Sequence, residues 1–431
     1  MLSKNKRKRL VPKGWKIINL GKEFKTSSGA TPLSSEKRFY ENGTIPWINS
    51  GELASPYIYE SSNYITQEGF DNSSTTMYPP NTVLVAMYGA TAGKASLLKI
   101  EACTNQAICA IFPNDNYCPQ FIKYSIDNLY DYLVGISSGS ARDNLSQAEL
   151  KDLELIVPQT RKEQEVLAST LSLLDKKIEL NRQINDNLEA MAKQLYDYWF
   201  VQFDFPNEEG KPYKSSGGAM VWNEKLKREI PQGWHCGTLL DIAEYTNGLA
   251  CQKYRPTDNN KLPVIKIKEM HDGLSADTEW VKTDIPDDVK VFDGDVLFSW
   301  SASLEVMLWA YGNGGLNQHI FKVTSKNGYP RSFYFYQLIH YVGIFKQMAE
   351  ARKTTMGHIT QDHLKQSTIA LPPNVDIANK LEEKLCPIFD EIVKNNQEII
   401  VLTKQRDELL PLLMNSQALI NYHLSVFYTK R

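Results

Sequence analysis

Residues 160–203 have the sequence TRKEQEVLASTLSLLDKKIELNRQINDNLEAMAKQLYDYWFVQF, and this stretch decides the fold. It contains neither Gly nor Pro, so no residue in it is a strong helix breaker. Its apolar residues recur every three or four positions except across the polar Asn181, and they are Leu167, Leu171, Leu174, Ile178, Ile184, Leu188, Met191, Leu195 and Tyr198. That spacing predicts one helix with a narrow apolar seam. At about 1.5 Å per residue the helix would be roughly 60 Å long, so we expect it to pair with a second helix.

A second stretch near the end of the sequence has the same spacing. Its apolar residues are Leu381, Leu385, Ile388, Ile392, Ile399, Leu402, Leu409 and Leu412. A polar residue occupies the seam at Asn181 in the first stretch, and at Asn395 or Asn396 and at Arg406 in the second. A buried Asn fixes the register of paired helices, and Pro387 predicts a kink or a restart. The alternative interpretation is two unrelated helices, each exposed to solvent.

The rest of the chain repeats itself. Residues 11–15 (VPKGW) recur as residues 230–234 (IPQGW), 219 positions later. Three further echoes keep nearly this spacing: Asn105-Gln106 with Asn317-Gln318, Ser146-Gln147 with Thr360-Gln361, and Pro158 with Pro372. They predict a duplicated unit, a globular domain followed by a long helix. Two such helices can form an antiparallel coiled coil about a pseudo-twofold axis, with the two domains held apart. Duplex DNA with two unlike half-sites suits that geometry.

Shorter patterns predict an α+β fold for each domain. We expect strands at 82–87, 107–112 and 153–157, a helix at 121–134, and a capping box from Ser146 to Glu149. Residues 204–218 are rich in Pro, Gly and Ser and predict a flexible linker. The predicted divisions are a first domain at 1–158, a helix at 159–203, a linker at 204–228, a second domain at 229–373, a helix at 374–414 and a tail at 415–431.

Composition excludes several classes of protein. The 431 residues are 42% hydrophobic and 23% charged, as in ordinary globular proteins. No apolar run approaches 18 residues, and the basic start has no apolar signal core after it, so we expect a soluble, cytoplasmic protein. Six scattered cysteines without a CxxC pair predict neither a disulfide framework nor a zinc site. The net charge of −2 gives no direct sign of a nucleic-acid partner.

Several motifs in a fixed order carry a resemblance to a known family. They are Gly29-Ala30-Thr31-Pro32, Tyr40, Gly43-Thr44-Ile45-Pro46-Trp47-Ile48, Asn105-Gln106, Asn144-Leu145-Ser146, Leu155-Ile156-Val157-Pro158, Glu163-Gln164, Trp199-Phe200-Val201, Phe203-Asp204-Phe205-Pro206, residues 210–218 (GKPYKSSGG) and residues 408–414 (ELLPLLM). Across nearly the whole chain this order resembles the specificity (S) subunits of Type I restriction-modification systems. The second domain lacks the Gly-x-Thr-Pro and Ile-Pro-Trp-Ile motifs, so no residue role is transferred there.

The resemblance implies two target-recognition domains, each of which reads one half of a bipartite DNA target. It also implies that the two helices set the unread spacer and bind two methyltransferase (M) subunits, and that restriction (R) subunits join through the complex. On this view the chain itself is not catalytic and holds no metal or cofactor. S-adenosylmethionine, ATP and magnesium would belong to the partner subunits. The bases of the DNA target and the spacer length do not follow from the sequence.

Arg, Lys, Asn, Gln and aromatic side chains are the groups that contact bases and phosphates. The candidates for DNA contact are Lys37, Arg38, Tyr88, Lys94, Arg142, Asn144, Lys253, Tyr254, Arg255, Lys266, Lys268, Trp300, Arg352, Lys353 and His358. The candidates for partner contact are Leu188, Met191, Leu195, Trp199, Ile399, Leu402 and Leu409. Two other function classes remain open: a coiled-coil scaffold, and a serine hydrolase built on Gly135-Ile136-Ser137-Ser138-Gly139. Residues 89–95 resemble a phosphate-binding loop, but they are one residue too short and end in Ala95 in place of Ser or Thr, so we expect a hairpin turn there.

Overall fold

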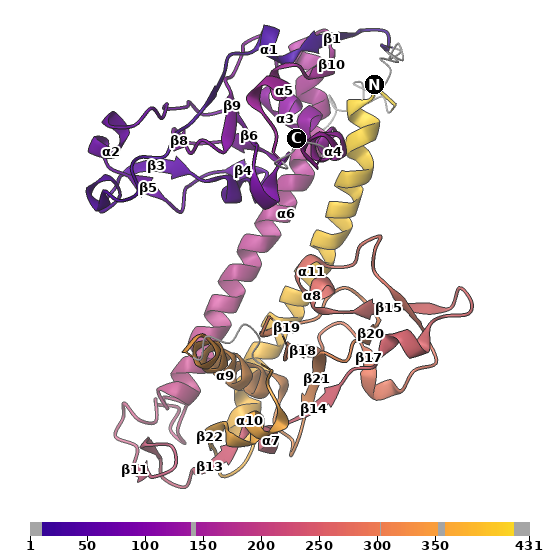
Figure 1. Ribbon diagram of the computed structural model, residues 1–431. Coiled ribbons are helices and arrows are strands. Elements are labelled where there is room, and N and C mark those ends of the chain that lie inside the picture. Colours follow the sequence, from indigo (N-terminus) through magenta and orange to yellow (C-terminus); the bar gives the residue numbers. More distant parts are fainter. Residues whose placement is uncertain (1–10, 139–143, 302, 352–357, 418–431) are drawn as a thin grey trace, which may run out of the picture. The chain divides into compact units, whose positions relative to one another are not determined.

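The computed structural model describes residues 11–138, 144–301, 303–351 and 358–417 (Figure 1). It divides into two compact units, which are described one at a time. Unit 1 comprises residues 1–177 and 402–431, and unit 2 comprises residues 178–401. Each of the two long helices therefore contributes one part of its length to each unit.

Unit 1 is built around a five-stranded sheet of order β2-β9-β6-β7-β4, a three-stranded sheet of order β5-β3-β8, and the pair β1-β10. The strands are β1 (Trp15–Asn19), β2 (Thr26–Ser28), β3 (Ile45–Ile48), β4 (Tyr57–Ile58), β5 (Tyr64–Ile65), β6 (Val83–Ala86), β7 (Ala95–Leu98), β8 (Cys103–Thr104), β9 (Ile108–Ile111) and β10 (Glu154–Pro158). The helices are α1 (Leu20–Glu23), α2 (Gln67–Asp71), α3 (Pro119–Asp127), α4 (Tyr130–Ser138) and α5 (Gln147–Lys151), with short 3-10 turns η1 (Lys37–Phe39), η2 (Ser50–Ala54) and η3 (Gly89–Thr91).

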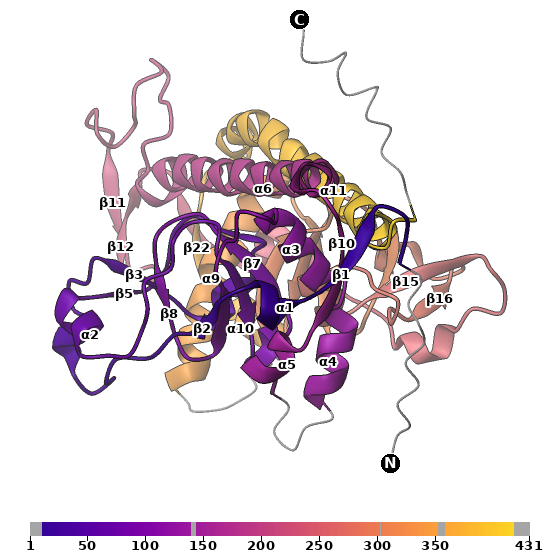
Figure 2. The same ribbon diagram turned by 90° about the horizontal axis from the view of Figure 1, so that it is seen from above.

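Helix α3 lies beside the first part of the long helix in both views (Figures 1 and 2). Its buried Phe121 packs in one cluster with Leu97 of the sheet and Leu171 of the long helix. The side chain of Gln164 accepts a hydrogen bond from the Cys118 backbone N–H at 2.9 Å, at the start of α3. The predicted strands and the capping box are confirmed, whereas the single helix predicted at 121–134 is wrong. The chain turns at Asn128, and α4 follows as a separate helix.

Unit 2 contains a four-stranded sheet of order β14-β21-β18-β19, a second of order β16-β15-β20-β17, and the pairs β13-β22 and β11-β12. The strands are β11 (Met220–Asn223), β12 (Arg228–Pro231), β13 (His235–Thr238), β14 (Ala243–Asn247), β15 (Lys261–Ile265), β16 (Trp280–Lys282), β17 (Lys290–Val291), β18 (Val296–Ser299), β19 (Glu305–Leu308), β20 (Gly314–Leu316), β21 (Ile320–Ser325) and β22 (Thr368–Leu371). The helices are α7 (Leu239–Ile242), α8 (Ile267–Asp272), α9 (Arg331–Ala351) and α10 (Gln361–Gln366), with 3-10 turns η5 (Cys251–Tyr254) and η6 (Asp287–Val289).

The two units share one topology, which confirms the predicted α+β fold with an internal repeat. The run β2-β9-β6-β7 in unit 1 matches β14-β21-β18-β19 in unit 2. The matching strand pairs also keep their register, since Val83 pairs with Ile111 where Val296 pairs with Val323. Likewise β3 pairs parallel with β8 in unit 1, and β15 pairs parallel with β20 in unit 2.

The two long helices are α6 (Arg161–Tyr196), extended by a π-helical turn η4 (Asp197–Val201), and α11 (Asp376–Met414). Within unit 2 they run antiparallel: the Asn181 amide donates to Glu398 at 2.7 Å, and the Asn185 amide, one turn later, donates to Asn396 at 2.8 Å. Helix α11 continues through Pro387, so of the two outcomes expected there, a kink or a restart, the restart does not occur.

The seam of α6 differs from the prediction at two positions beyond Asn181, whereas Leu188, Leu195 and Tyr198 pack against the core as predicted. Ile184 and Met191 are 36% and 49% exposed, whereas their neighbours Asn185 and Ala192 are buried. A buried Asn is stable only where its amide has partners, and Asn185 has them because Asn395 also donates to its side-chain oxygen at 2.9 Å. Buried asparagines in both helices confirm the expectation of polar seam positions.

Residues 204–218 are folded and do not form a flexible linker. The ring of Phe205 stacks between those of Tyr213 and Trp234, at centroid distances of 4.8 and 5.3 Å. Asp204 accepts a hydrogen bond from the Ser215 hydroxyl at 2.6 Å. The hairpin β11-β12 follows this segment (Figure 2).

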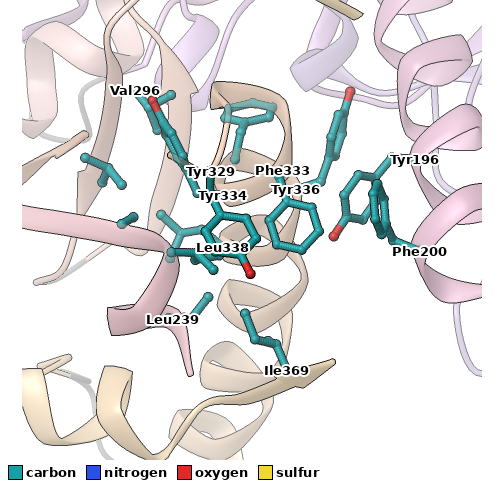
Figure 3. Packing of buried hydrophobic residues seen from close by; sticks show 14 of the residues in the cluster. Tyr196, Phe200, Leu239, Val296, Tyr329, Phe333, Tyr334, Tyr336, Leu338 and Ile369 are labelled. Carbon is teal, nitrogen blue, oxygen red and sulfur yellow. The ribbon is translucent and has the colours of Figure 1, made fainter. Parts of the chain in front are cut away.

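Aromatic side chains fill the core of unit 2 where α9 meets the end of α6. Tyr196 and Phe200 point toward Phe333 and Tyr336 of α9 (Figure 3). The rings of Tyr196 and Tyr336 stack at 4.9 Å. No helix in the described ranges is long and apolar enough to cross a membrane.

Candidate nucleic-acid interface

A tight turn between β8 and β9 presents Gln106 at the surface of unit 1. The Asn105 backbone N–H donates to the Ile48 carbonyl at 3.0 Å, and its side-chain oxygen accepts the Ala107 N–H at 3.0 Å. The Asn105 amide also donates to Asn49 at 3.1 Å. These hydrogen bonds hold the Asn105 side chain against the domain, and the next residue, Gln106, is exposed. We name residues 105–106, and their counterparts 317–318, the Asn–Gln corner.

Only glycine fits at position 29, directly after β2, where the chain passes close to this corner. A Cβ atom added to Gly29 would lie 1.9 Å from the Thr104 carbonyl oxygen. The neighbouring Ala30 N–H donates to the same oxygen at 3.0 Å. The close approach explains why the Gly-x-Thr-Pro motif begins with Gly.

The Asn–Gln corner of unit 2, residues 317–318, has the same backbone hydrogen bonds as that of unit 1. The Asn317 N–H donates to the Ile265 carbonyl at 3.0 Å, and the Leu249 N–H donates to the Leu316 carbonyl at 2.8 Å. A Cβ atom on Gly248 would lie 2.3 Å from the Asn317 oxygen, so Gly248 matches Gly29.

The second domain lacks both motifs as sequences, as expected, but it contains segments with the same backbone arrangement. Gly248 occupies the glycine position of the first motif. Residues 262–265 (LPVI) form part of β15 and take the place of residues 45–48 (IPWI) in β3, with the same parallel pairing. The motifs differ in side chains and agree in backbone hydrogen bonds.

Beside the corner of unit 1 lie two of the predicted residues. The Met87 N–H donates to the Ala107 carbonyl at 2.8 Å, and the Leu145 N–H donates to the Met87 carbonyl at 2.9 Å. Tyr88 and Asn144 each adjoin one of these residues in sequence, so the fold brings them close to Gln106. Tyr88 is exposed and Asn144 is partly exposed.

The matching loops of unit 2 bring together Trp300 and His358. The Trp300 N–H donates to the His319 carbonyl at 3.3 Å, and the Ile359 N–H donates to the Trp300 carbonyl at 3.0 Å. The Trp300 ring lies 5.8 Å from the rings of both His319 and His358. This cluster, with Gln318 beside it, provides flat aromatic faces and amide and imidazole nitrogens, which are groups that contact bases. The sequence did not single out Gln106, Gln318 or His319, although the repeated Asn-Gln pair was a signal for the two glutamines.

The basic candidates of unit 1 lie in two places. Lys37 and Arg38 form η1, where the Arg38 guanidinium pairs with Glu68 at 2.7 Å and remains 63% exposed. Lys94 is half-buried at the end of the η3 turn and lines a surface cavity. Arg142 lies outside the described residues.

Two lysines among the candidates of unit 2 are paired with acidic residues. Lys266 contacts Glu279 at 2.5 Å, and this hydrogen bond holds the pKa of the Glu279 carboxyl below its usual value. Lys268 lies 3.7 Å from Asp277. The remaining candidates are Lys253 and Tyr254 in η5 and Arg255 directly after it, while Arg352 and Lys353 lie outside the described residues.

The alternative catalytic patterns lack the required geometry. Ser137 lies in the last turn of α4, where its hydroxyl donates to the Val134 carbonyl at 2.9 Å, so it does not occupy a strand-to-helix elbow. Residues 89–94 join β6 and β7 as a hairpin turn, as predicted. Within the described part of the chain, no group of three or more His, Cys, Asp or Glu residues could hold a metal ion.

The partner-contact candidates separate by exposure. Trp199 is buried in the core of unit 2, and Leu188 and Leu195 pack against that core. The candidates on α11, which are half-buried, are Ile399, Leu402 and Leu409. Of the seven candidates only Met191 is largely exposed, and it shares one face of α6 with Leu180 and Ile184 at spacings of four and seven residues. We name Leu180, Ile184 and Met191 the exposed stripe.

Comparisons of the sequence with protein families and with individual proteins lead to the same family. The family model described as Type I restriction modification DNA specificity domain matches residues 12–190 and 231–418. The specificity subunit of the Type I restriction enzyme MjaIX from Methanocaldococcus jannaschii is 28% identical over 420 residues, which cover 94% of this chain and 93% of that protein. The EcoR124I/EcoR124II specificity subunit from Escherichia coli is 28% identical over 204 residues, 45% of this chain and 49% of that protein.

A solved structure supports the fold. The crystal structure of the S subunit of a Type I restriction-modification system from M. genitalium superposes with a TM-score of 0.57 at 15% identity, covering 96% of this chain and 97% of that one. The two family matches begin 219 residues apart, the same spacing as the repeated Pro-x-Gly-Trp segment. Two copies of one domain, each with a recognition fold and a long helix, thus account for 367 of the 431 residues, and the chain belongs to the Type I restriction modification DNA specificity family.

Proposed function

We propose that this chain is the subunit that selects the DNA sequence in a Type I restriction-modification complex, with each unit reading one half of a bipartite target. The observation that carries the proposal is the duplicated Asn–Gln corner. The corner has the same backbone hydrogen bonds in both units, but its neighbours are Tyr88 and Asn144 in one and Trp300 and His358 in the other. A common scaffold with different side chains is the arrangement that two unlike half-sites require.

The long helices would set the distance between the half-sites. They are single helices that enter both units, and buried asparagines fix their register in unit 2. Because the distance is set by the number of helical residues, insertion of four residues in 178–200 should lengthen the unread spacer without changing the half-sites.

The chain would act without catalysis of its own and would bind two methyltransferase subunits. The exposed stripe, Leu180, Ile184 and Met191, is the surface proposed for one of them, since exposed apolar residues on one helix face are buried most readily by a partner helix. Restriction subunits would join through that complex. S-adenosylmethionine, ATP and magnesium would serve the partners, and the complex would work in the cytoplasm, where its DNA lies.

Methylation mapping tests the proposal. The chain is expressed with its methyltransferase subunit, and methylated adenines are located by single-molecule sequencing of the host DNA. A split motif of two unlike halves with one fixed gap is expected. Absence of methylation, with the methyltransferase shown to be active beside another specificity subunit, would refute the proposal.

A single substitution tests whether each unit reads its own half of the DNA target. Arg255→Ala should relax recognition in the half-site of unit 2 alone, at about 1–3 kcal/mol if the guanidinium contacts a base. Equal weakening on every sequence would instead assign Arg255 to a phosphate contact.

A further inference from the structure

A carboxylate is buried at the place where the first recognition domain meets the long helices. Asp175 lies on α6 with a side chain that is 1% exposed, one helical turn after Leu171 of the apolar core of unit 1. A buried charge is unfavourable unless other groups pair with it. The groups that contact Asp175 therefore indicate its structural role.

Three side chains surround Asp175, and they come from two different elements. The Tyr124 hydroxyl of α3 donates to Oδ2 at 2.6 Å, and the Arg406 guanidinium of α11 donates to Oδ1 at 3.3 Å. The Lys123 ammonium of α3 lies 3.9 Å away. We name Asp175, Tyr124, Lys123 and Arg406 the Asp175 cluster. One carboxylate thus joins the recognition domain to both long helices.

The cluster continues into the recognition domain. The Tyr124 hydroxyl also lies 3.0 Å from the Tyr57 hydroxyl of β4, and Lys123 pairs with Asp127 at 2.8 Å. Burial and the neighbouring Asp175 charge raise the pKa of Tyr124 far above its usual value, so its hydroxyl remains a donor. The Tyr124 hydroxyl and the Arg406 guanidinium are thus the two hydrogen-bond donors to the Asp175 carboxylate, and the Lys123 ammonium adds a positive charge nearby.

Hydrogen bonds and ion pairs restrict sliding and rotation of a domain more strongly than apolar packing does. The hydrophobic effect depends on buried area and is non-directional, so a domain can slide or rotate by a small amount at little cost. A carboxylate that accepts hydrogen bonds from donors on two different helices keeps both bonds only over a narrow range of positions. The Asp175 cluster is therefore suited to fix the angle and the axial position of the domain on its helices.

Unit 2 has no such cluster at the matching position. Asp390 follows Asp175 by 215 residues, in agreement with the repeat, but its side chain is 65% exposed and pairs with Arg331 at 3.0 Å. There the domain packs on the helices through rings instead, with Phe335 and Phe389 5.3 Å apart. The same residue type in the same helix is thus buried in one unit and exposed in the other.

We propose that Asp175 is a positioning residue that holds the first recognition domain at one setting on the helix pair and thereby fixes the number of unread base pairs between the half-sites. This inference rests on the proposed function. Successive base pairs differ by about 3.4 Å along the duplex and about 35° around it. A domain freed to move by that amount would accept targets whose gap is one base pair longer or shorter.

The test compares Asp175→Asn with Asp390→Asn in the complete complex with its methyltransferase subunits. Asn has the size of Asp but lacks its charge, so the Arg406 and Lys123 charges lose their shared partner. Methylated sites are mapped in host DNA, and the half-site sequences and gap lengths are counted separately. For Asp175→Asn, the half-sites should stay the same, and the fraction of sites with a gap changed by one base pair should rise at least about tenfold over wild type. Asp390→Asn should match wild type.

Gap length separates positioning from stability. Lower overall methylation by Asp175→Asn with an unchanged gap would mean that the cluster only stabilises the fold, and the proposal would be wrong. If Asp175→Asn yields no folded complex, Tyr124→Phe removes one donor and keeps the ring. A single unchanged gap in that variant would equally overturn the proposal. Failure of wild type to give any split motif would instead count against the proposed function.

Discussion

Replacement of Gly248 by Ala should damage unit 2 in a way that the backbone geometry defines. The added Cβ would lie 2.3 Å from the Asn317 carbonyl oxygen and 2.4 Å from that of Leu316. Both neighbours are backbone atoms, so no side chain can rotate away. Ordinary contact requires the two segments to separate by roughly 1 Å.

That separation would break or weaken three hydrogen bonds. They are Leu249 N–H to Leu316 at 2.8 Å, Gln318 N–H to Leu249 at 3.0 Å, and Gly248 N–H to Ile320 at 3.1 Å. Each such bond contributes about 0.5–1.5 kcal/mol, so we expect a loss of about 2–4 kcal/mol in the free energy of unfolding. For a unit of this size the loss lowers the Tm of unit 2 by roughly 4–16 °C.

Thermal denaturation and methylation mapping check this prediction together. Gly343→Ala is the matched control, because Gly343 is exposed within α9 and a Cβ there meets no atom within 4 Å. Ala is favoured over Gly inside a helix by about 1 kcal/mol, so the control should raise the Tm slightly. Gly248→Ala should also weaken recognition of the half-site of unit 2 alone. An unchanged Tm with both half-sites intact would refute the account of the Asn–Gln corner.

Three further predictions follow from burial and exposure. Ile184→Glu in the exposed stripe should weaken binding of the methyltransferase subunit by about tenfold or more, measured by calorimetry, and change stability by less than about 0.5 kcal/mol. Asn185→Ala should lower the free energy of unfolding in urea by about 1–3 kcal/mol, because two asparagines of α11 lose a buried partner. Burial raises the pKa of the Cys103 thiol to about 11, so a thiol reagent at pH 8 should modify the half-exposed Cys236 and Cys386 well before Cys103.

Neighbouring residues provide the controls. Gln183→Glu is exposed beside Ile184 and should leave methyltransferase binding intact, and equal weakening by both variants would exclude the exposed stripe as the contact surface. Asn187→Ala is exposed and should change stability little, so a loss as large as that of Asn185→Ala would contradict the role of buried amides. Rapid modification of Cys103 in the folded protein would show that its strand opens readily.

The sequence predicted the elements whose signals are local. The long helices, the strands at 82–87 and 107–112 and the capping box at Ser146 depend on periodicity and turn residues within a short window. Ile184 and Met191 were placed in the seam of α6 incorrectly, because hydrophobicity favours them over their buried neighbours Asn185 and Ala192. The partners that make a buried Asn185 stable lie about 210 residues away in the sequence.

The candidate site was predictable in part. Trp300 and His358 were chosen from the sequence and lie together, and Tyr88 and Asn144 lie beside Gln106. The match between Gly248 and Gly29 was missed because only the absence of a Cβ atom is shared, while the surrounding side chains differ. Which lysines are already paired with acids, as Lys266 is with Glu279, also required the folded structure.

By itself the sequence determined that the chain is a duplicated unit with a long helix in each half, because periodicity and repeated segments are properties of the order of residues. Only the tertiary structure decided which face of each helix is buried, that residues 204–218 are folded around Phe205, and that Asp175 is buried whereas its counterpart Asp390 is exposed. The physical reason is that burial and hydrogen bonding depend on neighbours brought together by folding. A carboxylate of the same type at the same place in the repeat therefore differs in environment according to whether Tyr124 and Arg406 lie beside it.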